Sequence, residues 1–289
     1  MNAREWLEKA KKERFAIGAF NVANLETFKA VAEEAGEKKS PIIIESSPGE
    51  TAWMEAENVV DIARNFSEEL SIPIFVNLDH SEKVEDCMEG IEAGYDLIHF
   101  DGSALPYEEN LEITKKVVKE AHAKNLLVEA EIDRMARKSS EVYKEQISME
   151  ELRQTFSKPE VVKKFVEESG VDTMATLFGN IHGIFPSQPP LDYDLIKNIR
   201  EAVPNTFLSI HGSSGIPNKE ISKAIQVGGF VKVNINTEVR KVFKEELEEV
   251  LEENPDELAL YKIMPGVVEA VKKLVAEKID AYGSVGKVK

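Results

Sequence analysis

The sequence predicts an α/β fold, a single (β/α)8 TIM barrel with extra helices near its C-terminal end. Short apolar runs rich in β-branched residues recur along all 289 residues, and stretches with helical spacing separate them. Apolar runs without polar alternation are typical of strands covered on both faces, as in parallel sheets. Strands and helices that alternate through a chain of this length indicate a barrel.

Eight runs are expected to form the strands. They cover residues 15–21, 41–47, 73–79, 96–102, 126–132, 172–179, 206–212 and 230–236. The stretches with helical spacing between them include NLETFKAVAEEAGEKK (24–39), NLEITKKVVKEAHAK (110–124) and DLIKNIREA (194–202). A doubly wound open sheet is the alternative architecture, but no GxGxxG fingerprint follows the first strand.

The remaining segments complete the expected domain. Residues 1–15 are expected to form an amphipathic helix, and residues 237–258 and 264–283 two acidic helices after the last strand. No linker of Gly, Ser or Pro divides the chain, so we expect residues 1–289 to form one domain. The widest gap between strands is polar and too long for an ordinary loop. Two interpretations stay open for 132–160, an active-site lid and a solvated helical insertion.

Composition limits the classes of partner and compartment. The formal net charge of −17 argues against nucleic acid or an anionic membrane surface as the main partner. No run approaches the roughly 18 apolar residues of a membrane span. The single cysteine, Cys87, excludes an intramolecular disulfide and fits a reducing compartment, so we expect a cytoplasmic protein.

Histidines at strand ends are the main functional signal. Three of the five histidines, His80, His182 and His211, stand where an expected strand meets its loop. Barrel active sites are built at the C-terminal ends of the strands, and three imidazoles leave a coordination position of Zn²⁺ open for substrate. His99, inside a strand, and His122, on a helix, are interpreted as ordinary hydrogen-bonded residues.

Other polar residues are expected at the same end of the barrel. They are Asp79, Asp101, Ser103, Glu129, Glu131, Asn234 and Asn236. A metal held by the histidines can polarise a carbonyl and stabilise an enediolate. Asp79, next to one of the histidines, is then placed to act as general base and acid.

Two loops indicate an anion site. HGSSGIP, from His211, supplies small residues whose backbone N–H groups can approach an anion at a following helix start. NINTEVRKVF, from Asn234, follows the next strand in the same way. Barrels commonly build phosphate sites from the loops after their last two strands, so the sequence predicts a phosphorylated substrate.

With these motifs in view, the chain resembles the class II, metal-dependent fructose-bisphosphate aldolases and their ketose-bisphosphate relatives. The resemblance runs from GAFNVANLETFKAV through LDHS, HFDGSALPYEEN, VEAEI and GNIHG to HGSSGIPNKEISKAI, KVNINTEVR and YKIMPGVVEAV. It covers nearly the whole chain, and DGSxxPxEEN together with HGxSGIP is a specific combination. The resemblance implies zinc-dependent cleavage of a ketose 1,6-bisphosphate, first of all fructose 1,6-bisphosphate, to dihydroxyacetone phosphate and glyceraldehyde 3-phosphate. It also implies a homodimer or homotetramer.

The resemblance implies roles for individual residues. His80, His182 and His211 would bind the catalytic Zn²⁺, and Asp79 would move the proton of the sugar C4 hydroxyl. Asp101 and Glu131 match positions that hold a second divalent metal in some members, and many members bind Na⁺ or K⁺ nearby. The expected substrate-binding residues are Ser47, Gly183, Gly212, Ser213, Ser214, Asn234, Ile235, Asn236, Thr237 and Arg240.

Departures from the family pattern concern the aldehyde half of the substrate. LDHS replaces LDHG, and a loop with Arg134, Arg137 and Lys138 replaces the family's Gly-Gly lid with its acids. Glu141 is the nearest acid and the expected substitute. The arginines that usually flank the final PG segment and grip the second phosphate are absent. Arg240, Lys262 or the lid arginines are the candidate replacements.

Three alternatives stay open at this point. The enzyme could cleave a related keto-sugar phosphate, such as tagatose bisphosphate or an acidic sugar phosphate. A non-catalytic aldolase-like partner subunit would lack metal ligands, whereas His80, His182, His211 and Asp79 are all present. A metal-dependent hydrolase on the same scaffold would not require the two phosphate loops.

Overall fold

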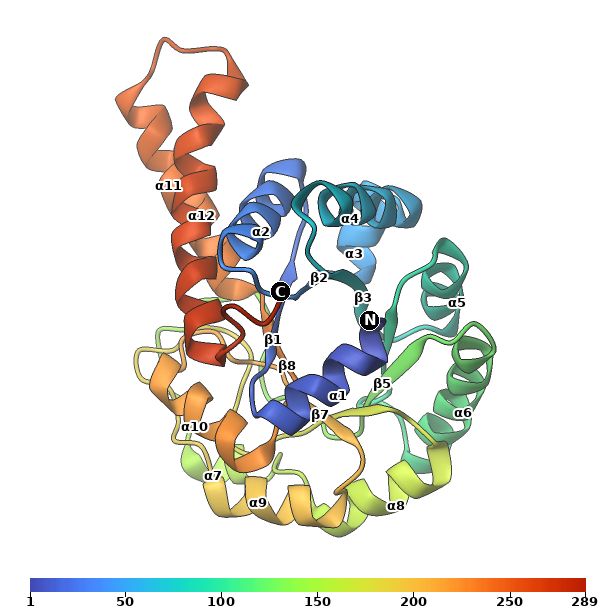
Figure 1. Cartoon of the computed structure of the whole chain (residues 1–289). Coiled ribbons are helices and arrows are strands. Elements are labelled where there is room, and N and C mark those ends of the chain that lie inside the picture. The colour runs from blue at the N-terminus through green and yellow to red at the C-terminus, as the bar shows by residue number, and fades with distance from the viewer.

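Eight parallel strands close into a barrel in the computed structural model, which describes residues 1–289 (Figure 1). Each strand pairs with its neighbours in chain order, and β1 closes the barrel on β8. The strands are β1 (Ile17–Asn21), β2 (Ile42–Ser46), β3 (Ile74–Ser81), β4 (Leu97–Asp101), β5 (Leu127–Glu131), β6 (Thr173–Ala175), β7 (Phe207–Ile210) and β8 (Lys232–Ile235). The predicted barrel is confirmed.

Helices surround the sheet and close one end of it (Figure 1). They are α1 (Ala3–Glu13), α2 (Leu25–Glu37), α3 (Pro48–Met54), α4 (Ala56–Leu70), α5 (Val84–Ala93), α6 (Tyr107–Ala123), α7 (Met149–Arg153), α8 (Pro159–Ser169), α9 (Tyr193–Ala202), α10 (Asn218–Gly228), α11 (Thr237–Glu253) and α12 (Leu260–Tyr282). None of these helices is long and apolar enough to cross a membrane.

The barrel interior changes from apolar to polar along the strand direction. At its N-terminal end, Trp6 and Leu7 of α1 pack against an apolar layer formed by Ile17, Ile43, Phe75, Leu97, Leu127 and Phe207. Because successive strand residues point to opposite faces, the next inward positions after Leu97 are His99 and Asp101. The polar side chains therefore lie toward the C-terminal end of the barrel, and most of them are buried there.

One strand is shorter than expected. β6 ends at Ala175 instead of continuing to Gly179, so His182 lies in the loop before α9 and not at a strand end. The cause is that the chain leaves the sheet at Leu177. The Ser157 N–H donates to the Leu177 carbonyl oxygen, and the Leu177 N–H donates to Ser157 Oγ, both at 2.8 Å. Gly179 then turns with φ of +118°, a conformation that L residues avoid.

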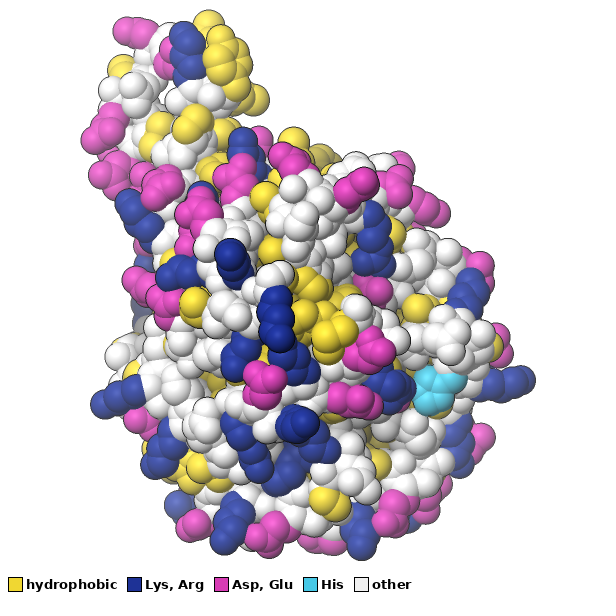
Figure 2. Space-filling view, viewed as in Figure 1, with side chains coloured by type: hydrophobic (Ala, Val, Ile, Leu, Met, Phe, Trp, Pro, Cys, Tyr) yellow, Lys and Arg dark blue, Asp and Glu magenta, His cyan; other side chains and the backbone are white.

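Helices α11 and α12 pack on each other and project from the barrel as an arm (Figure 1). Figure 2 shows apolar side chains on the end of this arm. Leu258, Leu260 and Tyr261, between and at the start of the helices, are 89%, 63% and 79% exposed. Apolar side chains gathered at an exposed end are typical of an association surface.

Candidate active site

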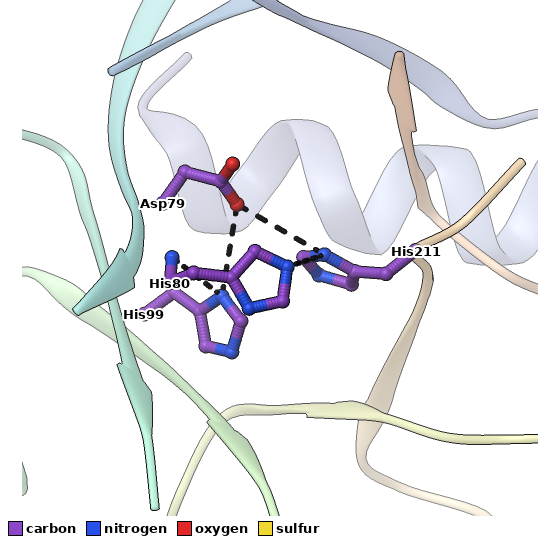
Figure 3. A group of neighbouring side chains, drawn as sticks. All are labelled: Asp79, His80, His99 and His211. Carbon is purple, nitrogen blue, oxygen red and sulfur yellow. Dashed lines mark hydrogen bonds and ion pairs between the residues drawn. The ribbon is translucent and has the colours of Figure 1, made fainter. Parts of the chain in front are cut away.

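The site is built on the inner rim of the barrel, where side chains from three strands converge (Figure 3). Asp79 and His80 come from β3, His99 from β4, and His211 follows β7 directly. His80 has a left-handed backbone with φ of +47°, and the β3–β4 register shifts between Leu78 and Ser81. A bulge of this kind redirects a side chain, here the His80 imidazole.

Two imidazoles face each other through one ring nitrogen each, and Asp79 Oδ1 lies 3.9 Å from the facing His211 Nδ1. His80 Nε2 lies 3.0 Å from His211 Nδ1. The other nitrogen of each ring contacts a carboxylate, His80 Nδ1 with Asp101 Oδ2 at 2.8 Å and His211 Nε2 with Glu129 Oε1 at 2.5 Å. A carboxylate on one ring nitrogen fixes the tautomer and turns the opposite lone pair toward a metal.

His182 completes the group of three predicted histidines from its loop position. Its ring centroid is 5.0 Å from that of His80, at an interplanar angle of 76°. Burial, together with the charge of His80, lowers the pKa of His182 to about 3, so its imidazole is neutral. Burial also lowers the pKa of His211 to about 3, against the effect of Glu129. Neutral imidazole is the form that binds metals.

His99 belongs to the same cluster, which the sequence interpretation missed. His99, Asp79, His80 and His211 offer ligand atoms that all lie within 4.8 Å of one another, a tighter set than one including His182. The His80 backbone N–H donates to His99 Nδ1 at 3.2 Å, and His99 Nε2 lies 3.6 Å from Glu131 Oε2. The signal was present in the alternation of β4, because His99 shares the inward face with Asp101.

Asp79 is buried and ionised. Its two oxygens accept amide hydrogens from Asn21 at 3.1 Å and from Asn234 at 3.0 Å. Burial alone would raise the pKa of Asp79, but the adjacent His80 charge and the other histidines hold it well below its usual range. His80 in turn has its pKa raised to about 10, because Asp79, Asp101 and Glu131 outweigh the effect of burial, so a metal on its Nε2 would have to displace a proton.

Asp101 and Glu131, the residues of the predicted second metal site, lie beside His80. One ligand atom from each of the three residues falls within 4.8 Å of the others. Burial and the neighbouring Asp101 charge raise the pKa of Glu131 well above its usual range, and its Oε2 has no hydrogen-bond partner. The pKa of Asp101 is lowered, because contact with His80 outweighs burial. An unpartnered carboxylate oxygen in a buried acidic pair is suited to a cation.

A buried lysine, Lys232, forms ion pairs with two buried carboxylates next to the histidines. Lys232 Nζ lies 2.7 Å from Glu129 Oε2 and 3.0 Å from Glu45 Oε1, and all three side chains are fully buried. Burial would raise the pKa of Glu129, but Lys232 and His211 hold it well below its usual range. Glu129 is therefore an ionised acceptor that orients His211.

We expect Lys232→Met to destabilise the fold by about 3–5 kcal/mol, because it leaves two buried carboxylates without their cation. Urea unfolding monitored by circular dichroism measures this loss. Lys116→Met, at an exposed position of α6, is the matched control and should change the unfolding free energy by less than about 0.5 kcal/mol. Equal stability of the two variants would show that Glu45 and Glu129 do not depend on Lys232.

The predicted phosphate residues gather around a small cavity next to the histidines. Its lining includes Gly183, Gly212, Ser213, Ser214, Asn234, Asn236 and Thr237, all of them predicted. Ser139 of the 132–160 segment also lines it, and the free space of about 20 Å³ suits one water molecule. Gly212 has φ of +60°, and a Cβ there would lie 2.6 Å from the backbone of Ile181, so only glycine fits.

Ile235 differs from the other predicted substrate-binding residues. Its side chain packs in the outer core between strands and helices, and it is fully buried there. Because the side chain points away from the cavity, only the backbone of Ile235 could contact a substrate.

A larger cavity of about 950 Å³ opens above the histidines. Asp79, His80, His182 and Asn236 line both cavities, so the two meet at the imidazoles. The 132–160 segment forms one wall of the larger cavity, whose lining also includes the predicted Ser47, Glu141 and Arg240. Arg240 contacts Glu50 and Ser140, and the Ser140 N–H donates to Thr237 Oγ1 at 3.1 Å. These contacts fasten the segment over the start of α11.

Comparison with known proteins agrees with this geometry. The family model described as class II fructose-bisphosphate aldolase matches residues 1–287. The chain belongs to the class II aldolase family. The aldolase fold and the enzyme class, a carbon–carbon lyase, follow from this membership.

Named relatives match this chain over nearly its whole length. The D-tagatose-1,6-bisphosphate aldolase subunit GatY of Klebsiella oxytoca is 33% identical over 288 residues, which cover 100% of this chain and 99% of that protein. The crystal structure of the YdjI aldolase of Escherichia coli K12 has a TM-score of 0.85 at 30% identity, over 100% of this chain and 99% of that one. A fructose-bisphosphate aldolase of Campylobacter jejuni, 21% identical with a TM-score of 0.84 over 98% and 95%, shares the fold.

Proposed function

We propose that this aldolase cleaves a ketose 1,6-bisphosphate to dihydroxyacetone phosphate and glyceraldehyde 3-phosphate with the aid of Zn²⁺. The observation that carries the proposal is the pair of facing imidazole nitrogens of His80 and His211, 3.0 Å apart, each turned by a carboxylate on its other nitrogen. This donor set fits zinc. When bound, the metal supplies Lewis-acid polarisation of the substrate carbonyl.

His80, His182 and His211 would hold the zinc. Asp101 and Glu131 would hold a second divalent ion, and the unpartnered Oε2 of Glu131 supports that assignment. The amide oxygens of Asn234 and Asn236 are also buried without partners, which supports a Na⁺ or K⁺ ion beside them. Hard oxygen ligands of this kind suit such cations.

Asp79 would carry the proton during bond cleavage. As an ionised carboxylate beside His80, it accepts the proton of the C4 hydroxyl while the C3–C4 bond breaks and the aldehyde forms. The electron pair of that bond stays on the triose half. Glu141, exposed on the wall of the larger cavity, would return a proton to C3.

The two cavities suit the two halves of the substrate. The triose phosphate would occupy the small cavity, where Gly183, Gly212, Ser213 and Ser214 present backbone and hydroxyl donors. Because that space now admits little more than one water, Ser139 and its neighbours must move aside when substrate binds. This need for movement supports the lid interpretation of 132–160.

Two stereoisomers are the leading substrates. Fructose 1,6-bisphosphate is named by the matching family model, whereas the relative GatY is named for tagatose 1,6-bisphosphate. The two ketoses differ in configuration at C4, next to the bond that breaks. GatY is named as a subunit, and we propose that this chain also forms an oligomer, with the exposed apolar end of the arm supporting that proposal.

Cleavage of both bisphosphates by purified protein, coupled to reduction of dihydroxyacetone phosphate, tests the function. We expect turnover on at least one ketose, a loss of more than about 100-fold after a chelator removes the metal, and recovery with added Zn²⁺. The ratio of kcat/KM values assigns the C4 preference. Full activity in protein shown by elemental analysis to be metal-free would contradict the zinc proposal.

A further inference from the structure

The larger cavity must receive the aldehyde half of the substrate. The small cavity and the larger one share Asp79, His80 and His182, and the bond that breaks must lie at these residues. A triose phosphate in the small cavity therefore directs the rest of the ketose into the larger cavity. This placement rests on the proposed function.

Most candidate cations for the far end of the substrate are already neutralised. Arg137 pairs with Glu151 at 2.7 Å, and Arg240 pairs with Glu50. Lys262 lies on the α12 arm, pairs with Glu257 at 2.9 Å and does not line the cavity. These three side chains are therefore poorly suited to bind a second anionic group of the substrate.

Two cations of the same cavity remain uncompensated. Arg134 and Lys138 line it, and the side chain of neither one forms an ion pair or a hydrogen bond within the chain. Their position is unusual in a protein of net charge −17, whose cavity also contains Glu82 and Glu141. Free cations on a wall facing the reacting centre favour an anionic ligand.

We propose that Arg134 and Lys138 form the subsite for an anionic group at the far end of the aldehyde half. The subsite selects aldehydes with a charged terminus, a phosphate or a carboxylate, over those with a neutral hydroxyl. A guanidinium and an ammonium suit such groups because their hydrogen bonds are charge-assisted.

The condensation reaction of the metal-loaded enzyme tests this subsite with three aldehydes of three carbons each. Dihydroxyacetone phosphate is combined with glyceraldehyde 3-phosphate, tartronate semialdehyde or glyceraldehyde, which end in a phosphate, a carboxylate and a hydroxyl. We expect Arg134→Ala and Lys138→Ala each to lower kcat/KM for the preferred charged aldehyde by about 10–100-fold. For glyceraldehyde the change should stay within about 3-fold. The better of the two charged aldehydes identifies the anion.

Lys144→Ala is the matched control, because Lys144 is exposed in the same loop and does not line the cavity. It should alter none of the three rates by more than about 2-fold. Equal losses on charged and neutral aldehydes in the Arg134 and Lys138 variants would overturn the subsite. Exchange of the dihydroxyacetone phosphate C3 proton with solvent, measured without any aldehyde, reports separately on the proposed function. Its absence in the unaltered enzyme would defeat that function, whereas its presence with unselective variants would defeat the subsite alone.

Discussion

Replacing Asp79 with asparagine is expected to lower kcat by about 10²–10⁴-fold on whichever ketose bisphosphate is cleaved. Asparagine keeps the size of the side chain but cannot accept the proton of the C4 hydroxyl. The metal should remain bound, because the hydrogen bonds that orient the imidazoles of His80 and His211 are made with Asp101 and Glu129, whereas Asp79 lies 3.9 Å from His211 Nδ1. Steady-state rates together with elemental analysis of the purified variant measure both properties.

Asp96→Asn supplies the control for this prediction. Asp96 is a largely buried carboxylate at the opposite end of the barrel, paired with Arg64 at 2.9 Å. Its replacement should reduce stability without changing kcat by more than about 2-fold. If Asp79→Asn kept near-normal turnover with a full complement of metal, another group would have to carry the C4 proton.

The barrel was predictable because its strands are buried on both faces and therefore carry nearly unbroken apolar sequence. The interior polar residues at the strand ends were predictable for the same reason, since Asp79, Asp101 and Glu131 interrupt those runs. The predicted β6 was too long. Leu177 has the sequence character of a strand residue, but its backbone forms hydrogen bonds with Ser157, which is distant in the chain.

Contacts between distant residues account for the rest. Two candidate cations for the second phosphate form ion pairs instead, Arg240 with Glu50 and Arg137 with Glu151. No local sequence pattern predicts either pair. His99 illustrates the reverse case. Its inward position follows from strand alternation, but its contacts with His80 and Glu131 depend on how β3, β4 and β5 are staggered around the barrel.

The structure poses the question of which histidine is the third zinc ligand, His182 or His99. His99 is nearer to His80 and His211, but its Nδ1 lone pair accepts the His80 N–H. The proton of a neutral His99 must then sit on Nε2, facing Glu131, so neither nitrogen has a lone pair free for a metal. The neutral imidazole of His182 forms no hydrogen bond through its ring, so a lone pair is available on it.

We therefore expect His182→Ala to weaken zinc binding by at least about 100-fold and to abolish cleavage, as loss of one ligand from a three-histidine site should. His99→Asn should change zinc affinity by less than about 5-fold, because the asparagine oxygen can replace Nδ1 as acceptor for His80. Competition with a chromophoric chelator measures both affinities without reference to activity. Tight zinc binding in His182→Ala, combined with its loss in His99→Asn, would transfer the ligand role to His99. In that case His99 could not accept the His80 N–H, and the left-handed backbone of His80 would have to be held by another contact.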